Sequence, residues 1–95
     1  MSPISTVDNP ADERYEARLD GRLAGIASYR LTGETITFTH TVVEPAFEGR
    51  GVGGALARTA LDDARARGLR VVPRCPFFAR WIRRHPDYAD LIVPG

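Results

Sequence analysis

The chain has 95 residues, of which 43% are hydrophobic and 26% charged, so its composition predicts one ordinary globular domain over residues 1–95. Its 13 basic residues are all arginine, yet the formal net charge is only +1. This near-neutral balance argues against a nucleic-acid-binding domain, because basic contacts to phosphates dominate such binding. The single cysteine excludes an internal disulfide, and the sequence shows neither a secretory leader nor an apolar run of roughly 20 residues. We therefore expect a cytoplasmic protein that does not contact membranes.

The first half of the sequence predicts an antiparallel meander. Residues 14–19 alternate between apolar and polar side chains, as a half-buried strand does. Asp20-Gly21 then forms a dipeptide that suits a tight hairpin turn, because both residues tolerate a positive φ. The strands expected are a short edge piece at 4–7, followed by 14–19, 22–31 and 35–43.

Strict alternation along these strands also predicts which side chains face the core. On the strand over 22–31 the expected inward residues are Leu23, Ala27, Tyr29 and Leu31. On the strand over 35–43 they are Ile36, Phe38, His40 and Val42.

The second half changes to helical spacing. Apolar residues from Val52 onward recur every three or four positions, and Gly68 is placed to end this helix. An apolar run over 69–72 predicts a buried strand that pairs in parallel after a crossover. Pro76 suits the first position of a short helix that reaches about Arg84. Phe77 and Trp81 are expected to face inward, with Phe78 and Ile82 as further candidates for that face. A final short element packs through Tyr88, Leu91 and Ile92, which completes an α+β fold with a mixed sheet.

The segment over 48–54 (Glu-Gly-Arg-Gly-Val-Gly-Gly) lies between a strand and a helix. Glycines let the backbone approach a ligand closely, and the helix that begins there adds unpaired N–H groups and the positive end of its dipole. A pyrophosphate is the natural occupant, and Arg50 adds a full positive charge. Glycine within a helix costs about 1 kcal/mol relative to alanine, so Gly53 and Gly54 favour a ligand site over a plain flexible loop. Three antiparallel strands precede the segment, which argues against a dinucleotide-binding βαβ unit.

This segment resembles the acyl-CoA loop of the GNAT superfamily of N-acetyltransferases, Gln/Arg-x-x-Gly-x-Gly/Ala. Gly51 and Gly53 match its two small positions, whereas Glu48 stands where Gln or Arg is usual. A short single-domain branch of the superfamily is matched more closely, by motifs spread from about residue 9 to residue 91. These motifs are His40-Thr41-x-Val43, Val72-Pro73-x-Cys75-Pro76-Phe77 and Ile82-x-x-His85-Pro86-x-Tyr88.

The resemblance implies a GNAT-like fold that binds acetyl-CoA as acetyl donor, needs no metal and transfers the acetyl group to an amine that the sequence does not identify. The cofactor-binding residues that it implies are Val42, Val43, Gly49, Arg50, Gly51, Val52, Gly53 and Gly54.

Two residues are candidates for catalysis. His40 lies just before the glycine segment, and a histidine with a pKa near 6.5 can take a proton from an attacking amine. Its expected position among apolar residues fits a structural histidine equally well. Cys75 stands at the expected start of a helix, which lowers the pKa of a thiol. It could form a transient thioester, protonate the departing CoA thiolate, or be a small buried hydrophobe.

Other readings stay open. The short chain and Glu48 are compatible with a module that binds CoA without catalysis. The basic run of Arg80, Arg83, Arg84 and His85 is expected to be a solvated helix end that interacts with the helix dipole. Tyr88 could act as an acid, but we expect it to pack in the core.

Overall fold

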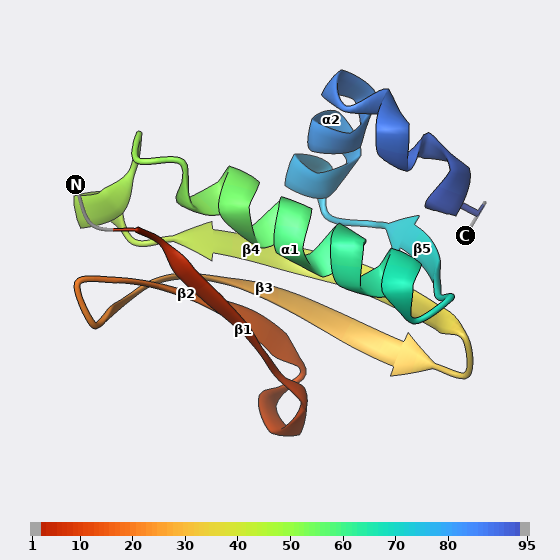
Figure 1. The fold of residues 1–95 in the computed structure, drawn as a ribbon, viewed down its shortest axis with the longest axis horizontal. Coiled ribbons are helices and arrows are strands. Elements are labelled where there is room, and N and C mark those ends of the chain that lie inside the picture. Colours follow the sequence, from red (N-terminus) through yellow and green to blue (C-terminus); the bar gives the residue numbers. More distant parts are fainter. Residues whose placement is uncertain (1–2, 94–95) are drawn as a thin grey trace.

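The computed structural model describes residues 3–93 and has the expected α+β architecture (Figure 1). Within these residues one five-stranded sheet has the order β1-β2-β3-β4-β5, antiparallel except for the parallel pair β4–β5. The strands are β1 (Ser5–Asn9), β2 (Arg14–Leu19), β3 (Arg22–Thr32), β4 (Thr35–Val43) and β5 (Arg70–Pro73). The helices are α1 (Val52–Ala66) and α2 (Pro76–Arg84), with 3₁₀ turns η1 (Pro10–Asp12), η2 (Pro45–Phe47) and η3 (Pro86–Leu91).

The ends of these elements follow the turn residues. Asp20 and Gly21 have φ values of 53° and 74°, as the tight hairpin between β2 and β3 requires. Gly68, with φ 68°, follows α1, and Pro76 occupies the first turn of α2. The predicted boundaries of β2, β4 and α2 are confirmed, and those of β3, β5 and α1 are within two residues.

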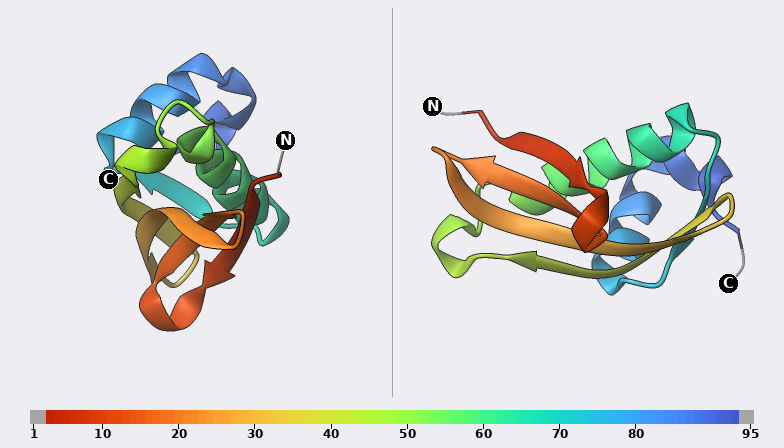
Figure 2. Two further views of the ribbon diagram at one scale, coloured as in Figure 1. Left: turned by 90° about the vertical axis from the view of Figure 1, so that its left-hand side faces the viewer. Right: turned by 90° about the horizontal axis from the view of Figure 1, so that it is seen from below.

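Both helices lie on one side of the sheet, and none of the described elements covers the other side, which we call the bare face (Figure 2). The core lies between the sheet and α1, with the Phe38 ring stacked on Phe78 of α2 at a centroid distance of 4.3 Å. Gly25 of β3 lets α1 approach closely, because a Cβ there would lie 2.9 Å from both the Val42 carbonyl oxygen and the Val52 side chain.

Because of two β-bulges, some side chains of β3 and β4 face the opposite side of the sheet from the one predicted. On β4, Phe38 pairs with Tyr29 and His40 with Ser28, so Thr39 is an extra residue. Ile36 and Phe38 therefore face the core as predicted, whereas the prediction for the two residues beyond the bulge was wrong. His40 is exposed and Val42 is 53% exposed.

The same effect occurs on β3, where Ala24 is the extra residue opposite β2 and moves Leu23 to the bare face. Ala27 and Tyr29 are buried as predicted, but Leu31 is 38% exposed near the end of the strand. On α2 the buried residues are Phe78 and Ile82.

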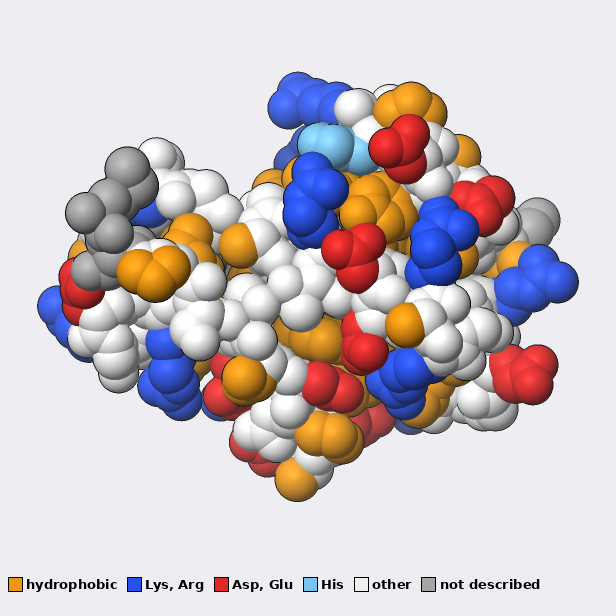
Figure 3. Space-filling view, viewed as in Figure 1, with side chains coloured by type: hydrophobic (Ala, Val, Ile, Leu, Met, Phe, Trp, Pro, Cys, Tyr) orange, Lys and Arg blue, Asp and Glu red, His pale blue; other side chains and the backbone are white. Residues whose placement is uncertain are grey.

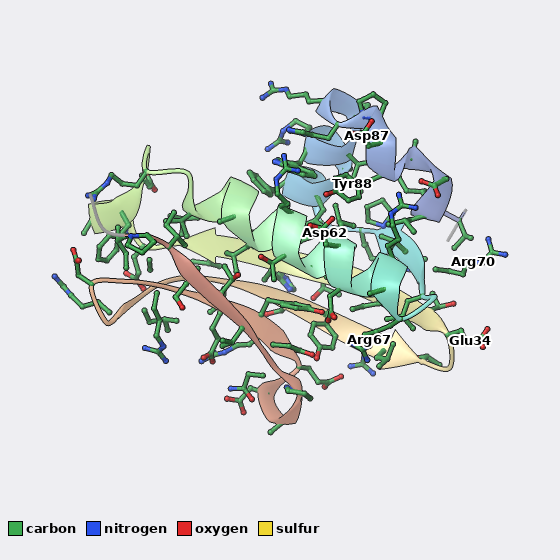
Figure 4. The ribbon with its side chains drawn as sticks, in the orientation of Figure 1. Glu34, Asp62, Arg67, Arg70, Asp87 and Tyr88 are labelled. Carbon is green, nitrogen blue, oxygen red and sulfur yellow. The ribbon has the colours of Figure 1, made fainter. Side chains whose placement is uncertain are left out.

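Hydrogen bonds from tyrosine hydroxyls to aspartates of α1 connect this helix to the sheet and to the C-terminal turn. Tyr88, which is 7% exposed, donates to Asp62 at 2.5 Å, as the predicted packing role requires (Figure 4). The Asp62 carboxylate raises the pKa of Tyr88. The hydroxyl of Tyr15 donates to Asp63, and burial together with that carboxylate raises the pKa of Tyr15.

Substitution by alanine should affect stability differently at Gly53 and at Gly54. A Cβ at Gly54 would lie 3.5 Å from Trp81 Nε1, an ordinary contact, so Gly54→Ala should raise the free energy of unfolding by up to about 1 kcal/mol. A Cβ at Gly53 would lie 2.8 Å from Phe77 Cζ, so Gly53→Ala should gain less or lose stability. Urea unfolding of both variants measures the difference, and equal stabilisation would contradict the Phe77 contact.

Candidate active site

The centre of the candidate site is the point where β4 and β5 stop pairing. Their last pair is Phe38 with Pro73, and the Cys75 N–H then donates to the Phe38 carbonyl at 2.8 Å. Beyond this bond no described strand lies on the β5 side of residues 39–43. We call this stretch the free edge of β4.

The backbone groups of the free edge can be assigned from its neighbours. The Glu44 N–H donates to the Ala24 carbonyl at 2.8 Å, so Glu44 faces β3. The Val42 carbonyl also faces β3, since it approaches the Cβ position of Gly25. Because successive residues of a strand alternate, the N–H and C=O groups of Thr41 and Val43 point away from β3, toward the gap.

The glycine segment forms a concave donor surface at the start of α1. Gly49 and Gly51 have φ values of 78° and 82°, and no atom lies within 4 Å of a Cβ built on either. The first hydrogen bond of α1 joins Ala55 N–H to the Gly51 carbonyl at 3.0 Å. Three amides therefore precede the first helical bond, and no side chain caps them. They belong to Val52, Gly53 and Gly54.

These three amides, the left-handed glycines and the exposed Arg50 are features that favour a negatively charged group. Val52 is only 1% exposed and belongs to the core, so its side chain offers a ligand no contact surface.

Cys75 lies at the start of α2, on the helix side of the sheet. It is the N-cap residue, and no side chain caps this helix either. The thiol is 3% exposed, and its Sγ lies 3.2 Å from Thr41 Oγ1. The bulge at Thr39 makes this contact possible, because it turns Thr41 toward the helix side. Thr41 belongs to the His40-Thr41-x-Val43 motif, but no catalytic or binding role was predicted for it from the sequence.

Phe77 connects the beginnings of the two helices. Its ring packs against Gly53, where a side chain would collide with it. Packing therefore explains Gly53 without a ligand, whereas the left-handed backbone of Gly49 and Gly51 has no such explanation. The contact also places the start of α2, with Cys75, beside the glycine segment.

His40 lies on the other side of β4 from Cys75. Its cross-strand neighbours are Ser28 on β3 and then Arg14 on β2, in one row across the bare face. The structure thus brings Cys75, Thr41, Phe77 and the glycine segment together, and places His40 and the Val42 side chain behind the strand.

The three arginines of the basic run are exposed, as predicted, and basic side chains gather over α2 (Figure 3). His85 is instead half-buried, and its Nδ1 lies 2.7 Å from the Trp81 carbonyl oxygen. Trp81 stacks on His85 with ring centroids 3.7 Å apart, and Arg58 of α1 lies 5.4 Å from the Trp81 ring. A hollow of about 450 Å³ lies between β1 and α1. Its carboxylates already accept hydrogen bonds from tyrosines, and none of residues 48–54 lines it.

Within residues 3–93 no helix has both the length and the apolar character of a membrane span. The same residues contain no cluster of three or more His, Cys, Asp or Glu side chains arranged to hold a metal ion.

Comparison with known proteins assigns the family. The profile described as GCN5-related N-acetyl-transferase matches residues 14–91. The chain belongs to this family. It is accordingly an acetyl-CoA-dependent N-acetyltransferase whose acceptor is unidentified.

Individual relatives agree with this assignment. The chain is 28% identical to Protein NATD1 of Xenopus tropicalis, over 99% of this chain and 93% of the relative. It is 41% identical to N-alpha-acetyltransferase RimI of Mycobacterium tuberculosis, but over only 60% of this chain and 39% of that protein. The fold matches a GCN5-like protein of Staphylococcus aureus with a TM-score of 0.74 at 21% identity, over 100% and 93% of the two chains.

Gly51→Ala should weaken acetyl-CoA binding by about tenfold, because the new Cβ obstructs the anion site or drives Gly51 out of its left-handed conformation. Gly33→Ala is the matched control, since Gly33 has φ 60°, open space around it and a place in the distant β3–β4 turn. Both variants should lose about 1–2 kcal/mol of stability. Calorimetric titration with acetyl-CoA distinguishes them, and equal affinities would exclude a role for Gly51 in binding.

Proposed function

We propose that acetyl-CoA binds between the free edge of β4 and the beginnings of α1 and α2, and that its acetyl group passes to an amine there. The observation that carries the proposal is that an unpaired strand edge lies beside two helix N-termini without side-chain caps. Such an edge offers amide partners, and such helix ends favour negative charge.

The pyrophosphate is assigned to the glycine segment. Its oxygens would accept from the amides of Val52, Gly53 and Gly54, with Gly49 and Gly51 keeping the surface open and Arg50 adding charge. Glu48 is exposed and adds a negative charge to the same loop.

The pantetheine arm is assigned to the free edge. Its two amides would pair with the backbone groups of Thr41 and Val43 in the manner of an added strand. The backbone of Val42 faces β3, so we assign this contact to Val43 and not to Val42. The thioester would then lie near Cys75 and Thr41.

The reaction needs a neutral amine and a protonated leaving group. The amine nitrogen attacks the thioester carbon, the new C–N bond forms, and the C–S bond breaks to release CoA thiolate. His40 would take the proton that the amine loses, and the thiolate would gain one to leave as CoA thiol. The relative named N-alpha-acetyltransferase RimI supports an amine as acceptor.

His40→Ala should lower kcat about 10²- to 10⁴-fold if His40 is the general base. Because His40 is exposed, this substitution should leave the midpoint of thermal unfolding and the affinity for acetyl-CoA almost unchanged. A fully active variant would contradict the assignment.

Cys75→Ala should lower turnover at least tenfold, and a rapid-quench experiment identifies the reason. Wild-type protein mixed with acetyl-CoA and no amine either does or does not form an acetyl-Cys75 adduct, which mass spectrometry detects. An adduct that disappears with added amine at the turnover rate indicates a covalent intermediate. Its absence indicates direct attack, with Cys75 as the acid. Full activity of Cys75→Ala would show that Cys75 is a structural core residue with no role in catalysis.

A further inference from the structure

The bare face contains a hollow of about 230 Å³ directly behind the free edge of β4. It is smaller than the roughly 300–1,000 Å³ of sites for drug-sized ligands, and so suits a slim molecule. We propose that this hollow binds the acetyl acceptor, and that the acceptor is an alkyl amine with a second ammonium group at its far end. This inference rests on the proposed function. The hollow is lined by Arg14, Leu23, Gly25, Ile26, Val42 and Glu44.

The middle of the hollow is apolar. Val42 is 53% exposed there, and Ile26 and Leu23 are half-buried beside it. Both bulges create this surface, because each moves an apolar side chain from its expected inward position to the bare face. A methylene chain buries well on such a floor.

The two ends of the hollow differ in charge. At one end Arg14, which is paired with Glu16, lies in the cross-strand row that continues through Ser28 to His40. Glu44 follows β4 at the other end, and within residues 3–93 its carboxylate has no hydrogen bond or ion pair. His40 and Glu44 are four residues apart along the chain, which is about 13 Å in an extended strand.

Glu44 is the carboxylate that remains for an external cation. The other acidic side chain of this region, Glu16, accepts from Arg14 at 2.9 Å and from Asn9 at 3.0 Å. Those two hydrogen bonds lower the pKa of Glu16. Arg14 therefore keeps its own partner and is not available to neutralise Glu44.

The unpaired carboxylate at only one end of the hollow determines the orientation of the bound acceptor. Because Glu16 is already paired with Arg14, the end of the hollow at Arg14 offers an ammonium no free carboxylate within the described part of the chain, which favours binding of the neutral amine that must attack. The second ammonium lies at Glu44, and the carbon chain crosses Val42. The donor on the helix side and the acceptor on the bare face then meet at the free edge of β4, where the C–N bond forms and the C–S bond breaks.

The test compares 1,6-diaminohexane with hexylamine as acceptors, after calorimetry has established acetyl-CoA binding. At low salt the diamine should have a kcat/KM per amino group about three- to fivefold higher, and added salt should reduce this preference. Glu44→Gln should bring the ratio of the two acceptors to about one. Glu34→Gln, which alters an exposed carboxylate at the opposite end of β4 (Figure 4), should keep it.

A second variant tests the apolar floor. Val42→Ser should reduce kcat/KM for hexylamine by about fourfold or more, the effect of one buried methylene, whereas Leu31→Ser on the far part of β3 should not.

Each outcome decides between the two proposals. Equal rates per amino group for the two amines in the wild type, a diamine preference that survives Glu44→Gln, or acetyl-CoA binding without transfer to either amine would overturn the acceptor assignment. Failure to bind acetyl-CoA would overturn the proposed function instead.

Discussion

The parallel pairing of β4 with β5 ends after four residues, and the candidate site depends on that early end. Pro73 is the last residue of β5, and the Arg74 N–H then turns back to donate to the Val72 carbonyl instead of continuing the ladder. Cys75 makes one more bond to Phe38, and Pro76 then begins α2. Among the described strands, none pairs with the remaining edge of β4. An exposed edge is normally a liability, so a ligand that pairs with it gives the arrangement a physical reason.

The bulge at Thr39 then determines what that edge presents to each side. One inserted residue reverses the two faces of β4 from His40 onward. Thr41 comes to lie against Cys75, while His40 and Val42 move to the bare face. Without the bulge, His40 would point into the core beside Phe38. A single local irregularity therefore separates the side of the strand that meets the donor from the side that meets the acceptor.

Sequence reasoning succeeded where local chemistry decides the structure and failed where register decides it. Asp20, Gly21, Gly68 and Pro76 end or begin elements through their own backbone preferences, so the element boundaries could be predicted. The left-handed glycines of the 48–54 segment were readable for the same reason. A bulge depends on how two strands pair, and the alternation within one strand contains no sign of it. The faces of His40, Val42 and Leu23 were therefore assigned wrongly.

The two proposed binding surfaces depend on different parts of the chain. The proposed donor surface is built from the glycine segment, α2 and backbone groups of β4, so it depends on glycines, helix ends and a strand edge. The proposed acceptor surface is built from side chains of β2, β3 and β4 that point away from the core. Side chains on that bare face can change with little effect on packing or on acetyl-CoA binding, because no described element rests on them. A fold of this size can thus keep one donor and vary its acceptor by substitution of a few exposed residues.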